Sequence, residues 1–245
     1  MRRFLAILAL FLSLLPYLGA LDLSGALHVD TYSGSPAVGF SFLAQENIAK
    51  GIAIRAQAEY LTAKAYDIQT LVLGKISRFT IGGGFALNIE NKPDLSVAPG
   101  VSLLMGMQVT SKMSLELSST FSLLSDNLSK LFGFKANAKI MYNNDNANAF
   151  LKYTIRGAEA RGFIHRFYAE TEAFEKGIPL ALLLGTGLDL FMTDQRELDV
   201  NVMGGFSIHT GKYGKYFAKA KVGVLSQREN SSLPYDISVG ASFSL

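Results

Sequence analysis

Apolar side chains alternate with polar or small ones along almost the whole chain after residue 20. The last segment, 235–245, illustrates the pattern. Its apolar positions are Tyr235, Ile237, Val239, Ala241, Phe243 and Leu245. Its polar or small positions are Asp236, Ser238, Gly240, Ser242 and Ser244. Because successive residues of a β-strand point to opposite faces, each such segment predicts a strand with one apolar and one polar face.

Residues that favour turns divide the chain into about fourteen such segments, each near the roughly ten residues that a tilted membrane strand needs. They cover 21–32, 36–45, 50–63, 65–76, 78–90, 95–109, 112–124, 131–143, 147–157, 160–174, 178–192, 197–209, 214–226 and 234–245. The sequence therefore predicts an all-β fold, an antiparallel transmembrane β-barrel with short turns on both sides. The alternative is about twelve strands, because the boundaries near 64–65 and 75–78 are weakly marked.

A soluble β-sandwich also alternates, because one face of each sheet is core and the other meets water. The regular spacing of the segments and the shortage of long, charged turns favour the barrel. In segment 197–209, for example, Leu198, Val200 and Val202 would face lipid, and Asn201 between them would meet water. Barrels of this kind begin and end on the periplasmic side. We therefore expect alternate turns to face the cell exterior, those near Ser33, Lys64, Asn91, Asp126, Gly157, Asp194 and Asn230.

The first twenty residues have the pattern of a secretory signal peptide: Arg2 and Arg3, an apolar run over 4–15, and the small pair Gly19 and Ala20. The apolar run is shorter than the roughly 20 residues that a membrane-spanning helix needs, which argues against an anchor. We expect residues 1–20 to be a cleaved signal and 21–245 to form a single barrel domain.

Composition narrows the possible functions. The chain has no cysteine, so it has neither disulfides nor cysteine metal sites nor the lipid attachment of an exported lipoprotein. Without Arg2 and Arg3 its formal charge falls from +3 to +1, which is too balanced for a nucleic-acid surface. The mean hydropathy of +0.24 is high for a soluble protein. Hydrophobicity spread over strands accounts for it.

These features together resemble bacterial outer-membrane β-barrel proteins of porin-like architecture. The resemblance rests on the signal, the alternation through the mature chain, and the C-terminal strand with Tyr235 and Phe243. It implies outer-membrane lipid as surroundings and recognition of the C-terminal strand by the barrel-assembly machinery. That class commonly ends in an aromatic residue, whereas this chain ends in Leu245.

Catalysis finds little support in the sequence. The chain has three histidines, His28, His165 and His209. His165 alternates with Phe163 and Phe167 and is expected to face lipid or the interface. His209 lies at a strand end beside Thr210, and His28 has no evident nucleophile. A membrane-embedded lipid hydrolase would need a serine within reach of His28 or His209. The glycine-rich stretches 82–84 and 185–187 do not continue into a nucleotide-binding loop. We expect no enzyme activity, no cofactor and no metal.

The polar face of the predicted strands carries the candidate site. The basic residues expected to line a pore are Lys135, Lys139, Lys152, Arg156, Arg166, Lys219 and Lys221. The acidic residues expected there are Glu59, Asp67, Glu90, Glu116, Asp189, Asp199 and Asp236. Aromatic residues near the strand ends are expected to form the membrane-interface girdles: Tyr60, Tyr66, Tyr142, Phe163, Tyr216 and Tyr235.

Opposed charged walls across a water-filled bore bias the choice of ions, so the sequence favours passive diffusion of small hydrophilic solutes. Lys139, Lys152 and Arg166 are expected near mid-height, with most carboxylates nearer the strand ends, which predicts a weak preference for anions. The alternative is a closed structural or surface-interaction barrel without a transport role, in which the charges pair with one another and plug the interior.

Overall fold

The computed structural model describes residues 21–31, 37–61, 65–91, 95–123, 132–158, 162–175, 177–192, 196–210, 214–226 and 233–244. These residues form fourteen strands: β1 (Leu21–Asp30), β2 (Ala37–Ala49), β3 (Ile52–Leu61), β4 (Ala65–Ile76), β5 (Phe79–Asn91), β6 (Leu95–Gln108), β7 (Met113–Leu123), β8 (Phe132–Asn143), β9 (Ala147–Ala158), β10 (Gly162–Phe174), β11 (Leu180–Met192), β12 (Arg196–Thr210), β13 (Gly214–Ser226) and β14 (Tyr235–Ser244). The fourteen-strand prediction is confirmed. The predicted signal peptide lies outside the described residues.

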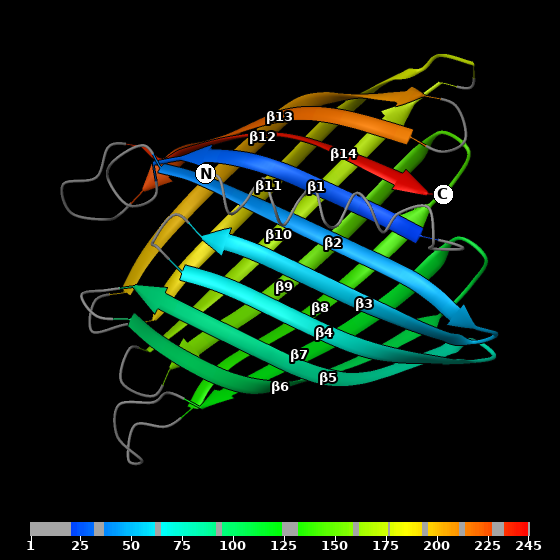
Figure 1. The fold of residues 1–245 in the computed structure, drawn as a ribbon. Helices are drawn as coiled ribbons and strands as arrows, with labels where there is room; N and C mark the ends of the chain where they lie inside the picture. The colour runs from blue at the N-terminus through cyan, green and yellow to red at the C-terminus, as the bar shows by residue number, and fades with distance from the viewer. Residues whose placement is uncertain are drawn as a thin grey trace, which may run out of the picture.

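Each strand pairs antiparallel with its neighbours in sequence, and β1 pairs with β14 to close the sheet into a barrel (Figure 1). At the closure, Val29 lies opposite Ile237 on one side and Val38 on the other. Every strand therefore has both edges paired, so no described strand presents an open edge to its surroundings. The described residues include no helix long and apolar enough to cross a membrane.

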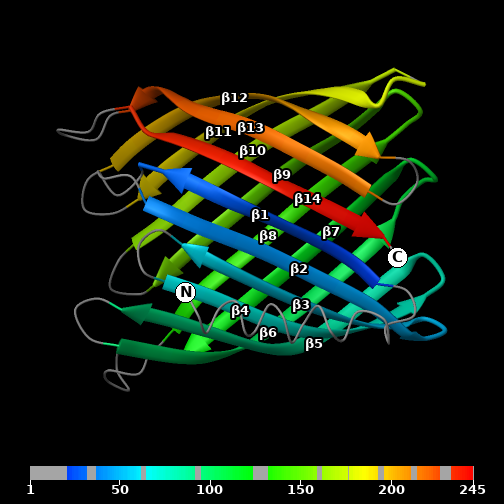
Figure 2. The same ribbon diagram turned by 45° about the horizontal axis from the view of Figure 1, so that its top comes forward.

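The two ends of the barrel differ (Figure 2). The start of β1, the end of β14 and the short turns Lys50–Gly51 and Ser77–Arg78 lie at one end. The last residues of β7 and β13 and the first residues of β8 and β14 lie at the other end, and more residues separate these strands than in the two short turns. Because the number of strands is even, the first strand begins and the last strand ends at the same end of the barrel. This is also the end with the two short turns.

The first tight turn differs from the prediction. The sequence predicts strands that break over 46–49, but β2 continues to Ala49 and the turn consists of Lys50 and Gly51. Gly51 has a φ of 77°, a left-handed conformation that glycine adopts at little cost. The pairing register also shifts between Asn47 and Ala49. A bulge of this kind adds a residue to one strand and interrupts the alternation on which the prediction depends.

The outer face of the barrel is apolar. Large hydrophobic side chains project from it on every part of the wall, with Phe85 79% exposed and Val38 61% exposed. An exposed apolar surface that surrounds a barrel is unfavourable in water and favourable in a bilayer. The opposite face points inward and carries most of the charged and polar side chains, together with a buried apolar cluster of Ala53, Leu71, Leu73 and Leu104.

Candidate functional site

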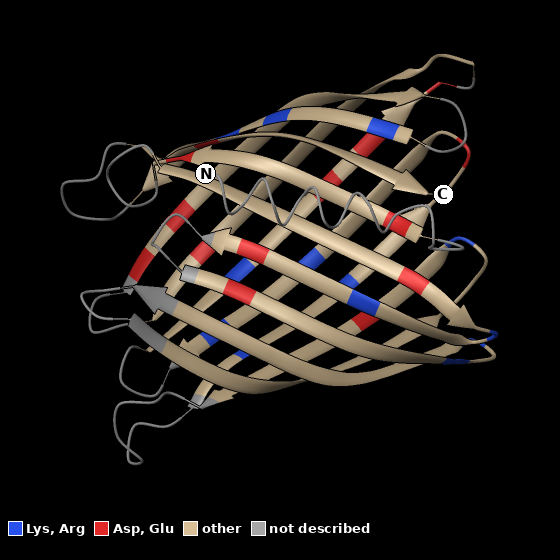
Figure 3. Cartoon of the chain, viewed as in Figure 1, with Lys and Arg blue, Asp and Glu red and all other residues tan. Residues whose placement is uncertain are grey.

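Ion pairs between strands that are not neighbours identify the inner face. Arg55 Nη1 on β3 lies 3.3 Å from Glu116 Oε2 on β7. Lys135 Nζ on β8 lies 3.4 Å from Asp67 Oδ2 on β4 and 3.8 Å from Glu59 Oε2 on β3. Strands that are not adjacent in a closed barrel can make such contacts only across its interior. Charged positions accordingly occur along the strands and not only at their ends (Figure 3).

The predicted charged residues share this inner face by register. The basic residues Lys135, Lys139, Lys152, Arg156, Arg166, Lys219 and Lys221 all lie on it. So do the acidic residues Glu59, Asp67, Glu116, Asp189, Asp199 and Asp236. Glu90 belongs to β5 opposite Ser96, but its side chain lies outside the described part of the structure. The interior of the barrel is therefore a strongly charged surface.

Two pairs of basic side chains lie side by side on the inner wall. Lys139 on β8 is directly opposite Lys152 on β9, and Lys135 is directly opposite Arg156. Like charges directly opposite each other on adjacent strands are destabilising. Lys135 is compensated across the interior by Asp67 and Glu59. Among the described residues neither Lys139 nor Lys152 forms an ion pair, and the Lys139 ammonium lies 4.7 Å from the centre of the Phe150 ring.

Arg166 does not belong to a free basic band, contrary to the expectation from sequence. Its Nε donates to Asp189 Oδ1 at 2.8 Å. Asp189 is directly opposite Asp199, and both carboxylates are almost fully buried, at 1% and 0% exposure. Ser226 Oγ donates to Asp199 Oδ1 at 2.8 Å. Alternation predicts which face a residue lies on, but it does not predict which residue lies opposite on the next strand. The ion pair between Arg166 and Asp189 therefore could not be predicted from the sequence.

A second charged cluster was not predicted. Glu172 on β10 accepts hydrogen bonds from Lys215 Nζ at 2.8 Å and from Asn148 Nδ2 at 3.2 Å. Glu170 accepts from Lys219 Nζ at 2.8 Å and from the Tyr168 hydroxyl at 2.7 Å. The alternation that places Arg166 inward also places Glu170 and Glu172 inward, and this signal was sufficient to find both. The cluster adds four charged side chains to the interior, but each carboxylate is paired with a lysine, so the added net charge is small.

Serines do lie near two of the histidines. His28 Nε2 is 3.0 Å from Ser41 Oγ, and His209 Nε2 is 3.5 Å from Ser207 Oγ. However, Ser207 donates to the Glu172 carboxylate, and His209 contacts that carboxylate through the same Nε2 atom at 3.0 Å. A catalytic triad needs the acid on the other ring nitrogen. The geometry is that of a hydrogen-bonded cluster centred on Glu172.

His165 lies on the outer face between Phe163 and Phe167, as expected, and its Nδ1 is 2.7 Å from the Tyr153 hydroxyl. Across the described residues, no group of three or more histidines and carboxylates has metal-binding geometry. The residues predicted to form the girdles also lie on the outer face: Tyr60, Tyr66, Tyr142, Phe163, Tyr216 and Tyr235. The ring centroids of Tyr60 and Tyr66 are 4.6 Å apart.

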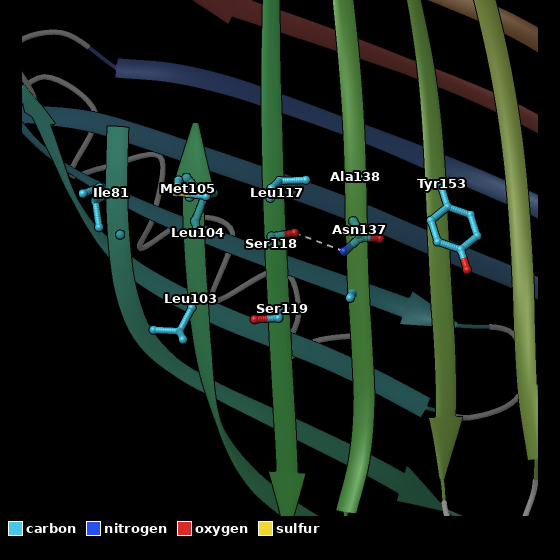
Figure 4. A pocket seen from close by; sticks show the side chains of 12 residues that line it. Ile81, Leu103, Leu104, Met105, Leu117, Ser118, Ser119, Asn137, Ala138 and Tyr153 are labelled. Carbon is cyan, nitrogen blue, oxygen red and sulfur yellow. Dashed lines mark hydrogen bonds between the residues drawn. The ribbon is translucent and has the colours of Figure 1, made fainter. Parts of the chain in front are cut away.

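The outer wall contains an apolar groove of about 500 Å³ over β5 to β9 (Figure 4). Ile81, Leu103, Met105, Leu117 and Tyr153 line it from the outer face. Ser118 and Asn137, which also contribute, are joined by a hydrogen bond of 3.2 Å. Most of the side chains that line the groove belong to the apolar outer face, so the groove is separate from the charged interior.

Comparison with known proteins supports the architecture alone. No family model matches the sequence, and none of the curated proteins matches it. Among solved structures, the CymD monoaromatic hydrocarbon channel is similar at 9% identity and a TM-score of 0.60, covering 93% of this chain and 89% of CymD. A bacterial polysaccharide outer membrane secretin matches at 11% identity and a TM-score of 0.56, covering 92% and 97% of the two chains.

An outer membrane channel from Pseudomonas putida F1 matches at 8% identity and a TM-score of 0.54. The match covers 93% of this chain and 96% of that channel. At these identities the likeness is one of fold. The predicted resemblance is confirmed at that level: this chain has the closed β-barrel fold of bacterial outer-membrane channels.

Proposed function

We propose that this protein is a passive diffusion channel for small hydrophilic solutes, inserted in the bacterial outer membrane after removal of residues 1–20. The apolar exterior and closed strand pairing support insertion in a bilayer. The end with the tight turns and both strand termini would face the periplasm. The terminal strand β14 would be the segment recognised by the barrel-assembly machinery.

The observation that carries the proposal is the lysine pair Lys139 and Lys152 on the inner wall. Burying two like charges that form no ion pair in a dry interior costs several kcal/mol per ion. Water and mobile ions screen such a pair when the interior is open. The pair therefore supports a hydrated bore and argues against a barrel sealed by its own side chains. The fold likeness to proteins described as channels agrees with this proposal.

We further propose a weak preference for anions. Arg166, Lys219 and Lys135 are each paired with a carboxylate. Lys139 and Lys152 form no ion pair among the described residues, although Glu116 lies directly opposite Lys139. A local positive potential lowers the barrier for anions and raises it for cations. The preference rests on two residues and not on the three that the sequence indicated.

The test is single-channel recording of the purified barrel in a planar lipid bilayer. Reproducible ohmic steps, with a reversal potential displaced towards the anion equilibrium potential in a salt gradient, support the channel. Insertion is checked separately by the slower migration of heat-denatured barrel on a gel. Protein that inserts correctly but never conducts contradicts the proposal.

One observation favours a second function, that of a closed structural barrel. Arg55–Glu116 joins β3 to β7, and Lys135–Asp67 joins β8 to β4. Both ion pairs bridge strands that are not neighbours in the wall, and their side chains narrow the interior. Such bridges could seal the barrel and serve only its stability. The same recordings separate the two functions, because a sealed barrel is silent at every ionic strength.

A further inference from the structure

We propose that Lys139, Lys152, Phe150 and Tyr168 form a binding site inside the barrel for a ring-bearing carboxylate. These residues lie on the inner faces of β8, β9 and β10. The inference deepens the proposed function and rests on it in one respect: the ligand reaches the site only if the interior is open to solvent from at least one end of the barrel.

The charged half of the site is the lysine pair. Lys139 and Lys152 are directly opposite each other, so their ammonium groups can approach one anion together. Glu116 lies opposite Lys139 on its other side, but Arg55 bonds Glu116 at 3.3 Å. Asp189 is engaged by Arg166, and Glu170 by Lys219. The nearby carboxylates thus have other cations, and the lysine pair retains capacity for an external anion.

The apolar half of the site is a pair of aromatic rings. The Phe150 and Tyr168 centroids are 5.6 Å apart, with their planes tilted by 46°. Tyr168 is directly opposite Lys152, and Lys139 lies 4.7 Å from the centre of the Phe150 ring. The Tyr168 hydroxyl donates to Glu170, which fixes the orientation of the ring. Aromatic rings that face a hydrated lumen leave apolar surface exposed, which a ligand ring can cover.

The combination selects the ligand class. A carboxylate can accept hydrogen bonds from both ammonium groups, with the gain in strength that ionised partners give. A ring attached to that carboxylate would then lie against Phe150 or Tyr168. Aromatic acids offer a π face to these rings, and sugar acids offer C–H groups. Both classes of acid combine a carboxylate with a ring, whereas simple inorganic anions carry a negative charge without a ring.

Isothermal titration of the folded barrel in detergent micelles tests the site without requiring conductance. The probes are benzoate and glucuronate, with acetate and chloride as ligands that lack a ring. We expect at least one ring-bearing acid to bind at least fivefold more tightly than acetate. If only benzoate binds, the ligand class is aromatic acids. If only glucuronate binds, the ligand class is sugar acids. Equal affinity for acetate and both ring-bearing acids overturns the inference.

Three variants separate the two halves of the site. Lys152→Gln should weaken binding of every carboxylate at least fivefold. Phe150→Leu should reduce the ratio of ring-bearing acid to acetate affinity. Lys112→Gln removes the same charge from an exposed turn and should change neither. If Phe150→Leu does not fold, Tyr168→Leu replaces it, and the wild-type comparison with acetate stands without any variant.

The outcomes for the site and for the channel are distinguishable. A barrel that conducts but binds ring-bearing acids no better than acetate retains the channel proposal and refutes the site. A barrel that binds them but never conducts retains the site and refutes passive diffusion.

Discussion

Arg55 and Glu116 form an ion pair of 3.3 Å although they belong to β3 and β7, with three strands between them in the wall. Both side chains are only partly buried, at 21% and 29% exposure. Such a pair gains little stability in a hydrated environment, about 0–1 kcal/mol. Its main physical effect is to place two long side chains across the bore.

Shortening this bridge should widen the bore. We predict that the double variant Arg55→Ala, Glu116→Ala conducts more than the parent while the barrel remains folded, because the lost ion pair contributes little stability. Single-channel conductance in symmetric salt is the measurement. Lys112→Ala, at an exposed turn, is the matched control. Unchanged conductance in the double variant would place the narrowest level elsewhere.

Neighbouring residues on β1 test the orientation of the wall. Leu27 is on the outer face and 56% exposed, whereas Ala26 is on the inner face between Ser41 and Gly240. Leu27→Arg should cost roughly 2–4 kcal/mol if the position lies near the bilayer midplane. Ala26→Arg should cost much less, because its charge meets the lumen. The free energy of unfolding in liposomes measures both, and equal costs would contradict a membrane-facing exterior.

Adjacent glycines on β12 provide a test of packing. A methyl group at Gly205 would lie 2.7 Å from the Cα and Cβ atoms of Lys219, whereas a methyl group at Gly204 would meet nothing within 4 Å. We predict that Gly205→Ala destabilises the barrel by about 1–3 kcal/mol, the usual cost of overpacking. Gly204→Ala should be neutral or slightly stabilising. The same unfolding assay compares them, and an equal effect would mean that the β12–β13 contact is looser than the structure indicates.

The strands and their faces could be predicted because both depend on a local signal. Alternation with period two identifies a strand and also which of its residues share a face. It places Lys139 and Glu116 on the inner face, and the register puts the two residues directly opposite each other. Where a bulge interrupts the period, as near Asn47, the predicted turn was wrong. Alternation therefore predicts the wall reliably wherever the pairing is regular.

Packing within the interior could not be predicted. The sequence places Asn201 inward and suggests that it meets water, but the structure buries it completely, at 0% exposure, opposite Gly187 and Gly223. Whether an inward side chain contacts water depends on its neighbours across the barrel, which are far away in sequence. The cross-barrel pair of Lys135 and Asp67 was missed for the same reason.

The three cations expected to set selectivity differ in their ion pairing. Arg166 is paired with Asp189, whereas Lys139 and Lys152 form no ion pair among the described residues. Replacing both Lys139 and Lys152 by Gln removes like-charge repulsion and breaks no ion pair among the described residues, so the barrel should fold as the parent does. Arg166→Gln should instead destabilise it, because Asp189 is 1% exposed and loses a hydrogen bond of 2.8 Å. Removing one partner of a buried pair costs about 3–5 kcal/mol, and the exposure of Arg166 itself lowers that figure.

The selectivity of the double variant follows from the same charges. We predict that Lys139→Gln, Lys152→Gln moves the reversal potential in a salt gradient towards cation selectivity. The difference from the parent should be large at 0.01 M salt, where screening extends over about 30 Å, and small at 1 M, where it extends over about 3 Å. Lys112→Gln controls for the change in net charge. If the double variant keeps the parent's reversal potential at low salt, the lysine pair does not line the permeation path. The anion preference would then have to arise elsewhere on the wall.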